Sequence, residues 1–259
     1  MWRTETALAR VSAALTLLLA ISTRGVSDSS LNPGFALAGF GEGTTPSPPW
    51  RLDLLPDRKI PPTQFVLRDI DGRRALEISA DASFGNYTHP FPQSARPGRL
   101  SWTWRVGRFA GGADLLRKRG DDNAIKVCAL FDLPIERVPW FERFLLKQAR
   151  KRTKKRLPAA TVCYVWDSTL PIGTKVHNPF SNRLRYLVLR SGSADGDMWF
   201  DESRDLARDF DDSFGRESGG TIPPLLGIAI GADSDNTKGK SLAWISGVTH
   251  KPIDAPQTK

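Results

Sequence analysis

The sequence contains few of the residues on which thiol, zinc and nucleotide chemistry depend. It has two cysteines and three histidines among 259 residues, and no cysteine has a histidine near it along the chain. Neither a Gly-rich phosphate loop, nor zinc-ligand spacing, nor the order of a catalytic triad occurs. These absences argue against a thiol enzyme, a zinc enzyme and a phosphate-loop protein, and we expect no cofactor.

Long apolar runs are also scarce. The run from Val11 to Ile21 follows Arg3 and Arg10 and ends near small residues. It is too short for a membrane-spanning helix, which needs about 20 apolar residues, and it is typical of a secretory signal peptide. We therefore expect residues 1–22 to direct export, which predicts a periplasmic or secreted protein.

Acidic residues are outnumbered, since 37 Lys and Arg stand against 28 Asp and Glu, giving a net charge of +9. Most of this excess lies between residues 134 and 158, where nine basic residues accompany only Glu136 and Glu142. The rest of the chain is close to balanced. A basic surface confined to one segment argues against a nucleic-acid partner for the fold as a whole.

The two cysteines, Cys128 and Cys163, each lie within a strand-like run. An exported chain meets conditions under which disulfides persist. The sequence leaves two alternatives open, a single Cys128–Cys163 disulfide or two buried thiols that act as small apolar residues, because it does not show whether the two strands are neighbours.

Alternating apolar residues predict about nine short strands. Trp102 and Trp104 fall on one face of such a strand, and Ser101, Thr103 and Arg105 fall on the other. No alternation of strands and helices occurs. The pattern predicts an all-β fold, an antiparallel, jelly-roll-like β-sandwich with about two helical insertions.

Turn and helix signals add detail to this fold. Asp71-Gly72 predicts a type I′ hairpin. The apolar runs 225–232 and 241–248 predict a closing hairpin. Leu206, Phe210 and Phe214 recur every four residues and predict a helix that ends at Gly215. The expected organisation is a signal peptide at 1–22, a flexible Gly/Ser/Pro-rich arm at 23–49, a single sandwich domain at 50–250 with a basic helical insertion at 134–158, and a tail at 251–259.

Two polar loops are candidate sites. The first holds Asp121 and Asp122 and is followed by Lys126. Adjacent carboxylates repel one another, so a site that keeps both ionised needs a cation or several hydrogen-bond donors. The alternative is an ordinary solvated loop that leads into a strand.

The second loop contains Asp233, Asp235, Asn236 and Thr237. Its oxygen atoms resemble the start of a calcium loop, but the glycine and distal glutamate of an EF-hand are missing. The alternatives are an ordinary Asp/Asn-rich hairpin turn and a turn that holds a structural calcium ion through Asp233 and Asp235.

Aromatic residues on the predicted strands have two interpretations. Such rings either pack in the sandwich core or stack on sugar rings, and core packing is the commoner role. The residues concerned are Trp102, Trp104, Tyr164, Trp166 and Trp199.

A basic helix is predicted from Pro139 to Lys155. Four apolar residues, Trp140, Phe141, Phe144 and Leu145, share helical spacing with Gln148. We expect this stripe to pack on the sandwich. In the alternative, the stripe and basic residues 147–156 lie on an anionic membrane surface or an acidic polysaccharide.

Several motifs together resemble one known family. They are Trp102-Thr103-Trp104-Arg105-Val106, Gly120-Asp121-Asp122, Phe131-Asp132, Tyr164-Val165-Trp166, Pro171 with Gly173, Asn178-Pro179, the segment 202–215 and Asp233-Ser234-Asp235-Asn236-Thr237. In this order they resemble the bacterial domain of unknown function 3047 family. The resemblance implies an exported β-sandwich reminiscent of carbohydrate-binding modules, with no established activity.

The chain departs from that family at a few positions. Members usually have an aromatic residue at the position of Cys128 and an arginine at the position of Lys126, and a lysine binds carboxylates less specifically than an arginine. The basic insertion is also longer than the resemblance leads us to expect.

Our leading hypothesis is a non-enzymatic binding domain for a glycan or another cell-envelope ligand. The expected site residues are Arg105, Asp121, Asp122, Lys126, Asp233, Asp235, Asn236 and Thr237. One alternative is a polysaccharide- or ester-acting enzyme that uses Asp121 or Asp122 as base and Arg105 or Lys126 to stabilise charge. Another is an envelope protein that associates with anionic membrane through its basic helix.

Overall fold

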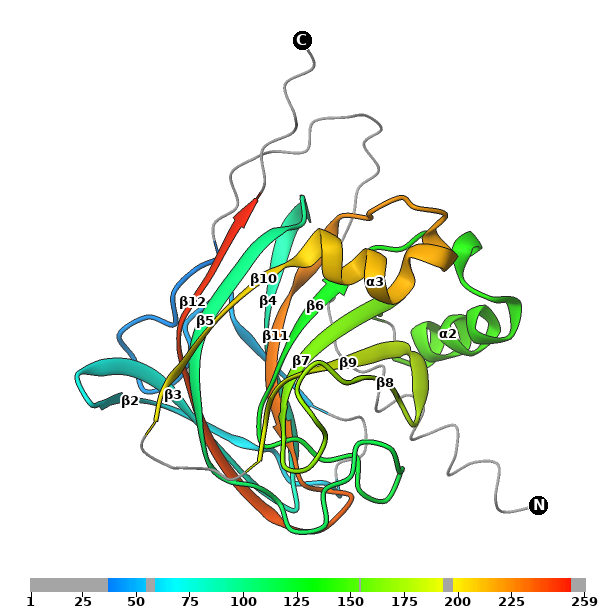
Figure 1. The fold of residues 1–259 in the computed structure, drawn as a ribbon. Coiled ribbons are helices and arrows are strands. Elements are labelled where there is room, and N and C mark those ends of the chain that lie inside the picture. The colour runs from blue at the N-terminus through cyan, green and yellow to red at the C-terminus, as the bar shows by residue number, and fades with distance from the viewer. Residues whose placement is uncertain (1–36, 55–58, 154, 193–197, 253–259) are drawn as a thin grey trace.

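Two β-sheets pack face to face in the computed structural model, which describes residues 37–54, 59–153, 155–192 and 198–252 (Figure 1). In spatial order the seven-stranded sheet holds β1 (Arg51–Asp53), β4 (Phe84–Ala95), β11 (Leu225–Asp233), β6 (Lys126–Phe131), β7 (Ala160–Asp167), β9 (Ser181–Ser191) and β8 (Lys175–Asn178). The five-stranded sheet holds β10 (Phe200–Asp205), β5 (Gly98–Arg108), β12 (Lys240–Pro252), β3 (Arg73–Asp81) and β2 (Gln64–Ile70). The strand pairs are antiparallel except β7 with β9. The predicted all-β, jelly-roll-like sandwich is confirmed.

The core between the sheets is aromatic. Trp102 and Trp104 are at most 2% exposed, which confirms the alternation predicted for β5. The ring centroids of Trp102 and Tyr164 lie 5.3 Å apart, and those of Trp104 and Trp166 lie 6.1 Å apart. Large rings such as these remove roughly 150–250 Å² each from water, so these four side chains hold the sheets together.

One predicted hairpin is confirmed and the other is wrong. Asp71 and Gly72 join β2 to β3 with φ angles of 53° and 71°, as a type I′ turn requires. The two runs of the expected closing hairpin become β11 and β12, which belong to different sheets. Every residue of β11 is buried, so its continuous apolar run reflects a strand covered on both faces and not a hairpin partner.

The helix α3 (Leu206–Ser218) packs on the end of the core. Leu206, Phe210 and Phe214 are fully buried, as their spacing predicts. The helix ends at Gly219, whose φ angle is 64°, and not at Gly215. The left-handed conformation that closes the helix therefore falls one turn later than we expect from the sequence.

The helix α2 (Trp140–Thr153) follows a short 3-10 turn (Ile135–Arg137) and lies near α3 on the side of β7 and β9 (Figure 1). Its buried side chains are Leu146 and Ala149. The expectation that the aromatic stripe packs on the sandwich is wrong, because Trp140 is 77% exposed and Phe141 and Phe144 are each 55% exposed. The aliphatic residues Leu146 and Ala149 face the core, and the aromatic residues lie on the opposite side of the helix.

The described part of the predicted arm packs against the sandwich. Leu37 and Phe40 are each 8% exposed, and the Trp50 indole N–H donates to the Ala38 carbonyl at 2.8 Å. The prediction of a flexible arm is therefore wrong for residues 37–49, because their apolar side chains join the core. The predicted signal peptide and the rest of the arm lie outside the described residues.

The last strand extends two residues past the predicted end of the domain at residue 250. Lys251 and Pro252 belong to β12, and the rest of the predicted tail lies outside the described ranges. Of the helices described, none combines the length and the hydropathy of a membrane span.

Candidate functional site

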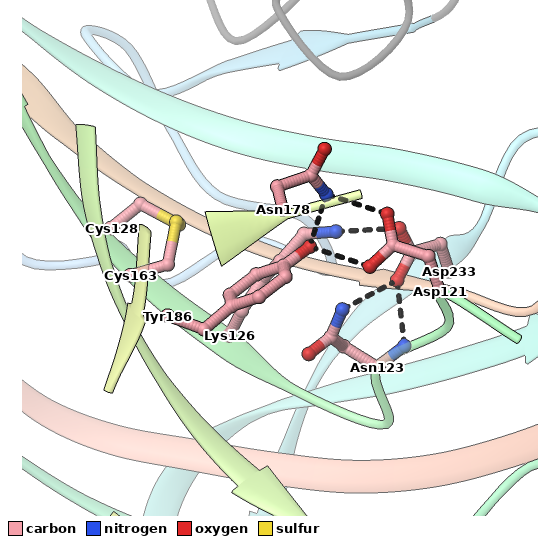
Figure 2. The surroundings of a disulfide bond; sticks show 8 residues. All are labelled: Asp121, Asn123, Lys126, Cys128, Cys163, Asn178, Tyr186 and Asp233. Carbon is pink, nitrogen blue, oxygen red and sulfur yellow. Dashed lines mark hydrogen bonds and ion pairs between the residues drawn. A yellow bond between two sulfur atoms is a disulfide. The ribbon is translucent and has the colours of Figure 1, made fainter. Parts of the chain in front are cut away.

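The outer face of the seven-stranded sheet, directed away from the five-stranded sheet, carries the Cys128–Cys163 disulfide (Figure 2). The two cysteines lie directly opposite each other on β6 and β7, with an S–S distance of 2.02 Å. Leu115 from the loop before β6 packs in the same apolar cluster. Of the two alternatives left by the sequence, the structure contains the disulfide.

Lys126 and Asp233 form a buried ion pair beside this disulfide. Lys126 Nζ lies 2.6 Å from Asp233 Oδ2, and the two side chains are 4% and 7% exposed. Lys126 begins β6 and Asp233 ends β11, and these strands are antiparallel neighbours. The Asn123 backbone N–H donates to Asp233 Oδ1 at 2.8 Å. Burial raises the pKa of Asp233, and the positive charge of Lys126 opposes that rise.

Asp121 lies next to this pair (Figure 2). The Tyr186 hydroxyl donates to Asp121 Oδ1 at 3.0 Å, and Asn178 Nδ2 donates to Asp121 Oδ2 at 2.5 Å. Burial, followed by the negative charge of Asp233, raises the pKa of Asp121 to about 7. Burial and the same two carboxylates also raise the pKa of Tyr186 well above its usual value. The charge of Asp121 therefore changes near neutral pH.

Asp122 joins the two loops that the sequence singles out. Its Oδ1 accepts from the Asn236 backbone N–H at 3.1 Å, and its Oδ2 accepts from the Thr237 backbone N–H at 2.7 Å. Asn236 Nδ2 also donates to the Asp121 carbonyl at 3.1 Å. The two loops are more than 100 residues apart along the chain, and Asp122 fixes the turn that carries Asp235.

Asp235 is the half-buried acid at the edge of this group. Burial, then the charges of Asp233 and Asp122, raise the pKa of Asp235 to about 6. We call Asp121, Asp122, Lys126, Asp233 and Asp235 the acidic cluster. Because four carboxylates share one lysine, the cluster has more hydrogen-bond acceptors than donors.

Arg105 is not part of the acidic cluster. It lies on the outer face of the five-stranded sheet, where its Nη1 is 3.0 Å from Asp71 Oδ2. Its guanidinium carbon lies 4.9 Å from the Trp199 ring centroid and 4.3 Å from that of Trp244. The expectation that Arg105 meets Asp121 is wrong, because a side chain that alternates with Trp104 must point away from the core and therefore away from the other sheet.

Two buried polar residues that the sequence patterns do not single out lie beside the acidic cluster. Asn86 on β4 pairs with Gly231 on β11, and Gly231 in turn pairs with Lys126. Gly231 has no side chain, and the Asn86 amide occupies the space above it. Thr88 pairs with Ala229 in the next position on the same face. Directly paired residues share a face, so these side chains lie on the outer face with Lys126.

The polar atoms of these two residues have no hydrogen-bond partner among the residues that the structure describes. Asn86 and Thr88 are both 0% exposed, and Asn86 Nδ2, Asn86 Oδ1 and Thr88 Oγ1 make no hydrogen bond within the described ranges. Phe84 precedes Asn86 by two residues on β4, and the centroid of its ring lies 5.4 Å from Lys126 Nζ. The only sequence signal for this arrangement is the alternation of Phe84, Asn86 and Thr88 along an extended run.

A calcium ion does not fit at Asp233. Lys126 Nζ already lies where a cation would contact that carboxylate. In the part of the chain that is described, no group of three or more His, Cys, Asp or Glu side chains could hold a metal ion.

The family described as "Protein of unknown function (DUF3047)" matches residues 48–249, and the chain belongs to this family. A search of curated protein sequences finds no match.

Among solved structures, the chain is similar to a cellulase variant derived from Cel12A of Rhodothermus marinus, with 11% identity, coverage of 77% of this chain and 89% of that chain, and a TM-score of 0.41. Endoglucanase 3 of Trichoderma harzianum, from family GH12, has 10% identity, coverage of 84% and 94%, and a TM-score of 0.41. The xyloglucanase domain of NopAA from Sinorhizobium fredii, solved with cellobiose, has 9% identity, coverage of 85% and 100%, and a TM-score of 0.41.

Proposed function

We propose that this DUF3047 protein is an exported, non-enzymatic binding domain whose ligand is a glycan or another hydroxyl-rich molecule of the cell envelope. The ligand contacts the acidic cluster together with Asn86 and Thr88. The observation that carries the proposal is the pair of fully buried side chains, Asn86 and Thr88, whose polar atoms lack partners in the described structure.

Unpaired buried polar atoms are costly for a fold. Each buried donor or acceptor without a partner costs about 1–3 kcal/mol, and native proteins retain few of them. Here three such atoms lie together on one face, next to Lys126. A fold that only needed to be stable would place apolar side chains at these positions. Retention of polar groups at a cost in stability is typical of binding sites.

The chemistry of these groups favours a neutral, hydroxyl-rich ligand. The Asn86 amide and the Thr88 hydroxyl both donate and accept, whereas the carboxylates of Asp121 and Asp235 accept when ionised. A sugar hydroxyl also donates and accepts, so it satisfies all of these groups. A phosphate or sulfate group would instead meet an excess of carboxylates, which disfavours an anionic ligand here. The half-buried Asp235 marks the edge at which such a ligand meets solvent.

A glycan array tests this proposal. The chain without residues 1–22 is applied to an array of bacterial envelope glycans, and each positive glycan is titrated calorimetrically. We expect Asn86→Ala to weaken binding at least tenfold, because a good hydrogen-bonded contact is worth about 1.5 kcal/mol. Asn182→Ala, at an exposed asparagine that donates to Glu142, serves as the matched control and keeps the wild-type affinity. Equal affinities for the wild type and Asn86→Ala would contradict the proposal.

A second candidate function, hydrolysis of a polysaccharide or ester, rests on Asp121. Its pKa of about 7 allows it to take up or release a proton near neutral pH, as a general acid or base must. The two acidic loops meet at one place, which this function requires. This second function would be favoured if the wild type turns over polysaccharide or ester substrates and Asp121→Asn does not. Binding without turnover in the wild type would leave the first proposal in place.

A further inference from the structure

We infer that the outer side of α2 docks on an anionic lipid bilayer. Three aromatic side chains gather at the N-terminal half of this helix. Trp140 is 77% exposed, and Phe141 and Phe144 are each 55% exposed. The ring centroids of Trp140 and Phe141 lie 5.7 Å apart, so the rings form one exposed apolar group. Contiguous exposed aromatic residues of this kind mark a surface that another phase or molecule covers.

Basic residues continue the same side of the helix toward its C-terminus. Lys147 and Lys151 follow Phe144 at three and seven residues, and Trp140 precedes it at four, so the four side chains form one stripe. Lys147, Lys151 and the neighbouring Arg152 are exposed and have no acidic partner among the residues described.

Three other described basic residues of this segment are already engaged. Lys155 Nζ lies 3.0 Å from Asp53 Oδ1, and Arg156 pairs with Asp132. Arg150 Nε donates to the Leu157 carbonyl at 3.0 Å. Among the described basic residues of α2, Lys147, Lys151 and Arg152 lack such a contact, and Lys147 and Lys151 continue the stripe of Trp140 and Phe144.

The surface extends beyond the helix. Phe141 and Phe180 line a common groove of about 220 Å³ between α2 and the turn that joins β8 to β9. Lys118 Nζ lies 5.5 Å from the Phe180 ring centroid. The loop before β6 thus places a lysine beside Phe180, which lines this groove together with Phe141. We call Trp140, Phe141, Phe144, Lys147, Lys151 and Lys118 the α2 surface.

An anionic bilayer fits both the aromatic and the basic side chains of the α2 surface. Tryptophan and phenylalanine favour the boundary between headgroups and acyl chains, where their rings leave water. Lysines beside an inserted aromatic group reach the phosphates of anionic lipids. A soluble acidic polysaccharide would complement the lysines, but it offers no acyl layer to cover Trp140 and Phe144. The combination of aromatic and basic residues therefore favours the lipid surface.

Vesicle sedimentation tests this inference. The chain is mixed with phosphatidylcholine vesicles that contain either no phosphatidylglycerol or about one third phosphatidylglycerol. We expect binding to the anionic vesicles alone, with an affinity that falls as salt screens the charges. The double variant Trp140→Ser/Phe144→Ser and the double variant Lys147→Glu/Lys151→Glu should each weaken vesicle binding at least tenfold. All four side chains lie on the solvent side of α2, so circular dichroism should report a wild-type fold.

Matched controls come from other exposed positions. Met198→Ser removes an apolar side chain that is 54% exposed beside the five-stranded sheet, and Lys251→Glu reverses an exposed charge at the end of β12. Both should bind vesicles as the wild type does. Vesicle binding that neither double variant weakens would overturn the inference. So would binding to heparin without binding to vesicles, or a dimer that Trp140→Ser/Phe144→Ser dissociates.

Discussion

Lys126 Nζ lies 2.6 Å from Asp233 Oδ2, and this ion pair joins the start of β6 to the end of β11 on the buried outer face of the larger sheet. Asp121 lies to one side of the pair and Asn86 to the other. The pair therefore lies at the centre of the proposed binding site, and each buried charge depends on the other for its compensation.

Removing the lysine leaves a buried carboxylate without its partner. We expect Lys126→Met to lower the free energy of unfolding by about 3–5 kcal/mol, because an uncompensated buried charge is strongly destabilising. The double variant Lys126→Met/Asp233→Asn removes both charges and should recover most of this loss. Urea unfolding measures both values, and a loss below about 1 kcal/mol in the single variant would contradict a buried pair.

The stability of the chain should depend on pH through Asp121. An exposed aspartate has a pKa of 3.8, whereas burial raises the pKa of Asp121 to about 7 in the folded protein. A raised folded-state pKa contributes stability that is present below 3.8 and is lost as pH rises through 7. Asp121→Asn lacks this dependence, so its stability relative to the wild type should increase as pH rises from 4 to 7. Unfolding curves at several pH values measure the difference, and a relative stability that is constant or falls with pH would show that Asp121 is not held in this environment.

The disulfide should contribute substantially to stability. Cys128 and Cys163 close a loop with a sequence separation of 35 residues. Removing such a cross-link by Cys128→Ala/Cys163→Ala should cost about 2–4 kcal/mol. Denaturant unfolding of the variant, and of the wild type with and without a reductant, checks this value. If the reductant leaves the unfolding midpoint of the wild type unchanged, the two thiols are not linked.

Arg105 should matter for stability and not for ligand binding. Its guanidinium lies over the Trp199 and Trp244 rings and contacts Asp71. Arg105→Ala should lower the free energy of unfolding by about 1–2 kcal/mol through loss of these contacts. The affinity for any glycan found on the array should stay within twofold of the wild type. Loss of glycan binding in a folded Arg105→Ala protein would place the site on the other sheet.

Much of the fold follows from local patterns. Alternation predicts which face of β5 is buried, and Asp71-Gly72 predicts the β2–β3 hairpin because its backbone requires positive φ angles. The same alternation directs Arg105 away from the core. The partnership of Arg105 with Asp121 fails because the two residues lie on different sheets, and which sheet a strand joins depends on long-range pairing.

The site is predictable in part. Asp122 and the turn at Asn236 stand out as polar loops, but their contact depends on the pairing of β6 with β11. Asn86 and Thr88 do not stand out, because a polar residue in an extended run usually faces solvent. Their burial follows from the covering of both faces of the larger sheet, which no short-range pattern encodes.

The orientation of α2 has a similar explanation. Trp140 and Phe144 recur at helical spacing, and so do Leu146 and Ala149, so the sequence offers two apolar sides. The sandwich surface accommodates Leu146 and Ala149, which leaves Trp140 in solvent. The shape of the sandwich surface beneath α2 determines which of the two apolar sides of the helix is buried.

The most direct test of the binding site does not depend on the identity of the ligand. It compares the free energies of unfolding of Thr88→Val and Thr63→Val by urea denaturation at one pH. Both threonines are buried, but the Thr63 hydroxyl donates to the Ala232 carbonyl at 3.0 Å, whereas the Thr88 hydroxyl has no partner in the described structure. Valine has the shape of threonine and lacks the hydroxyl, so Thr63→Val should lose about 1–2 kcal/mol, whereas Thr88→Val should be as stable as the wild type or more so. A loss in Thr88→Val equal to that in Thr63→Val would show that the Thr88 hydroxyl serves the fold, and it would contradict a polar face kept for a ligand.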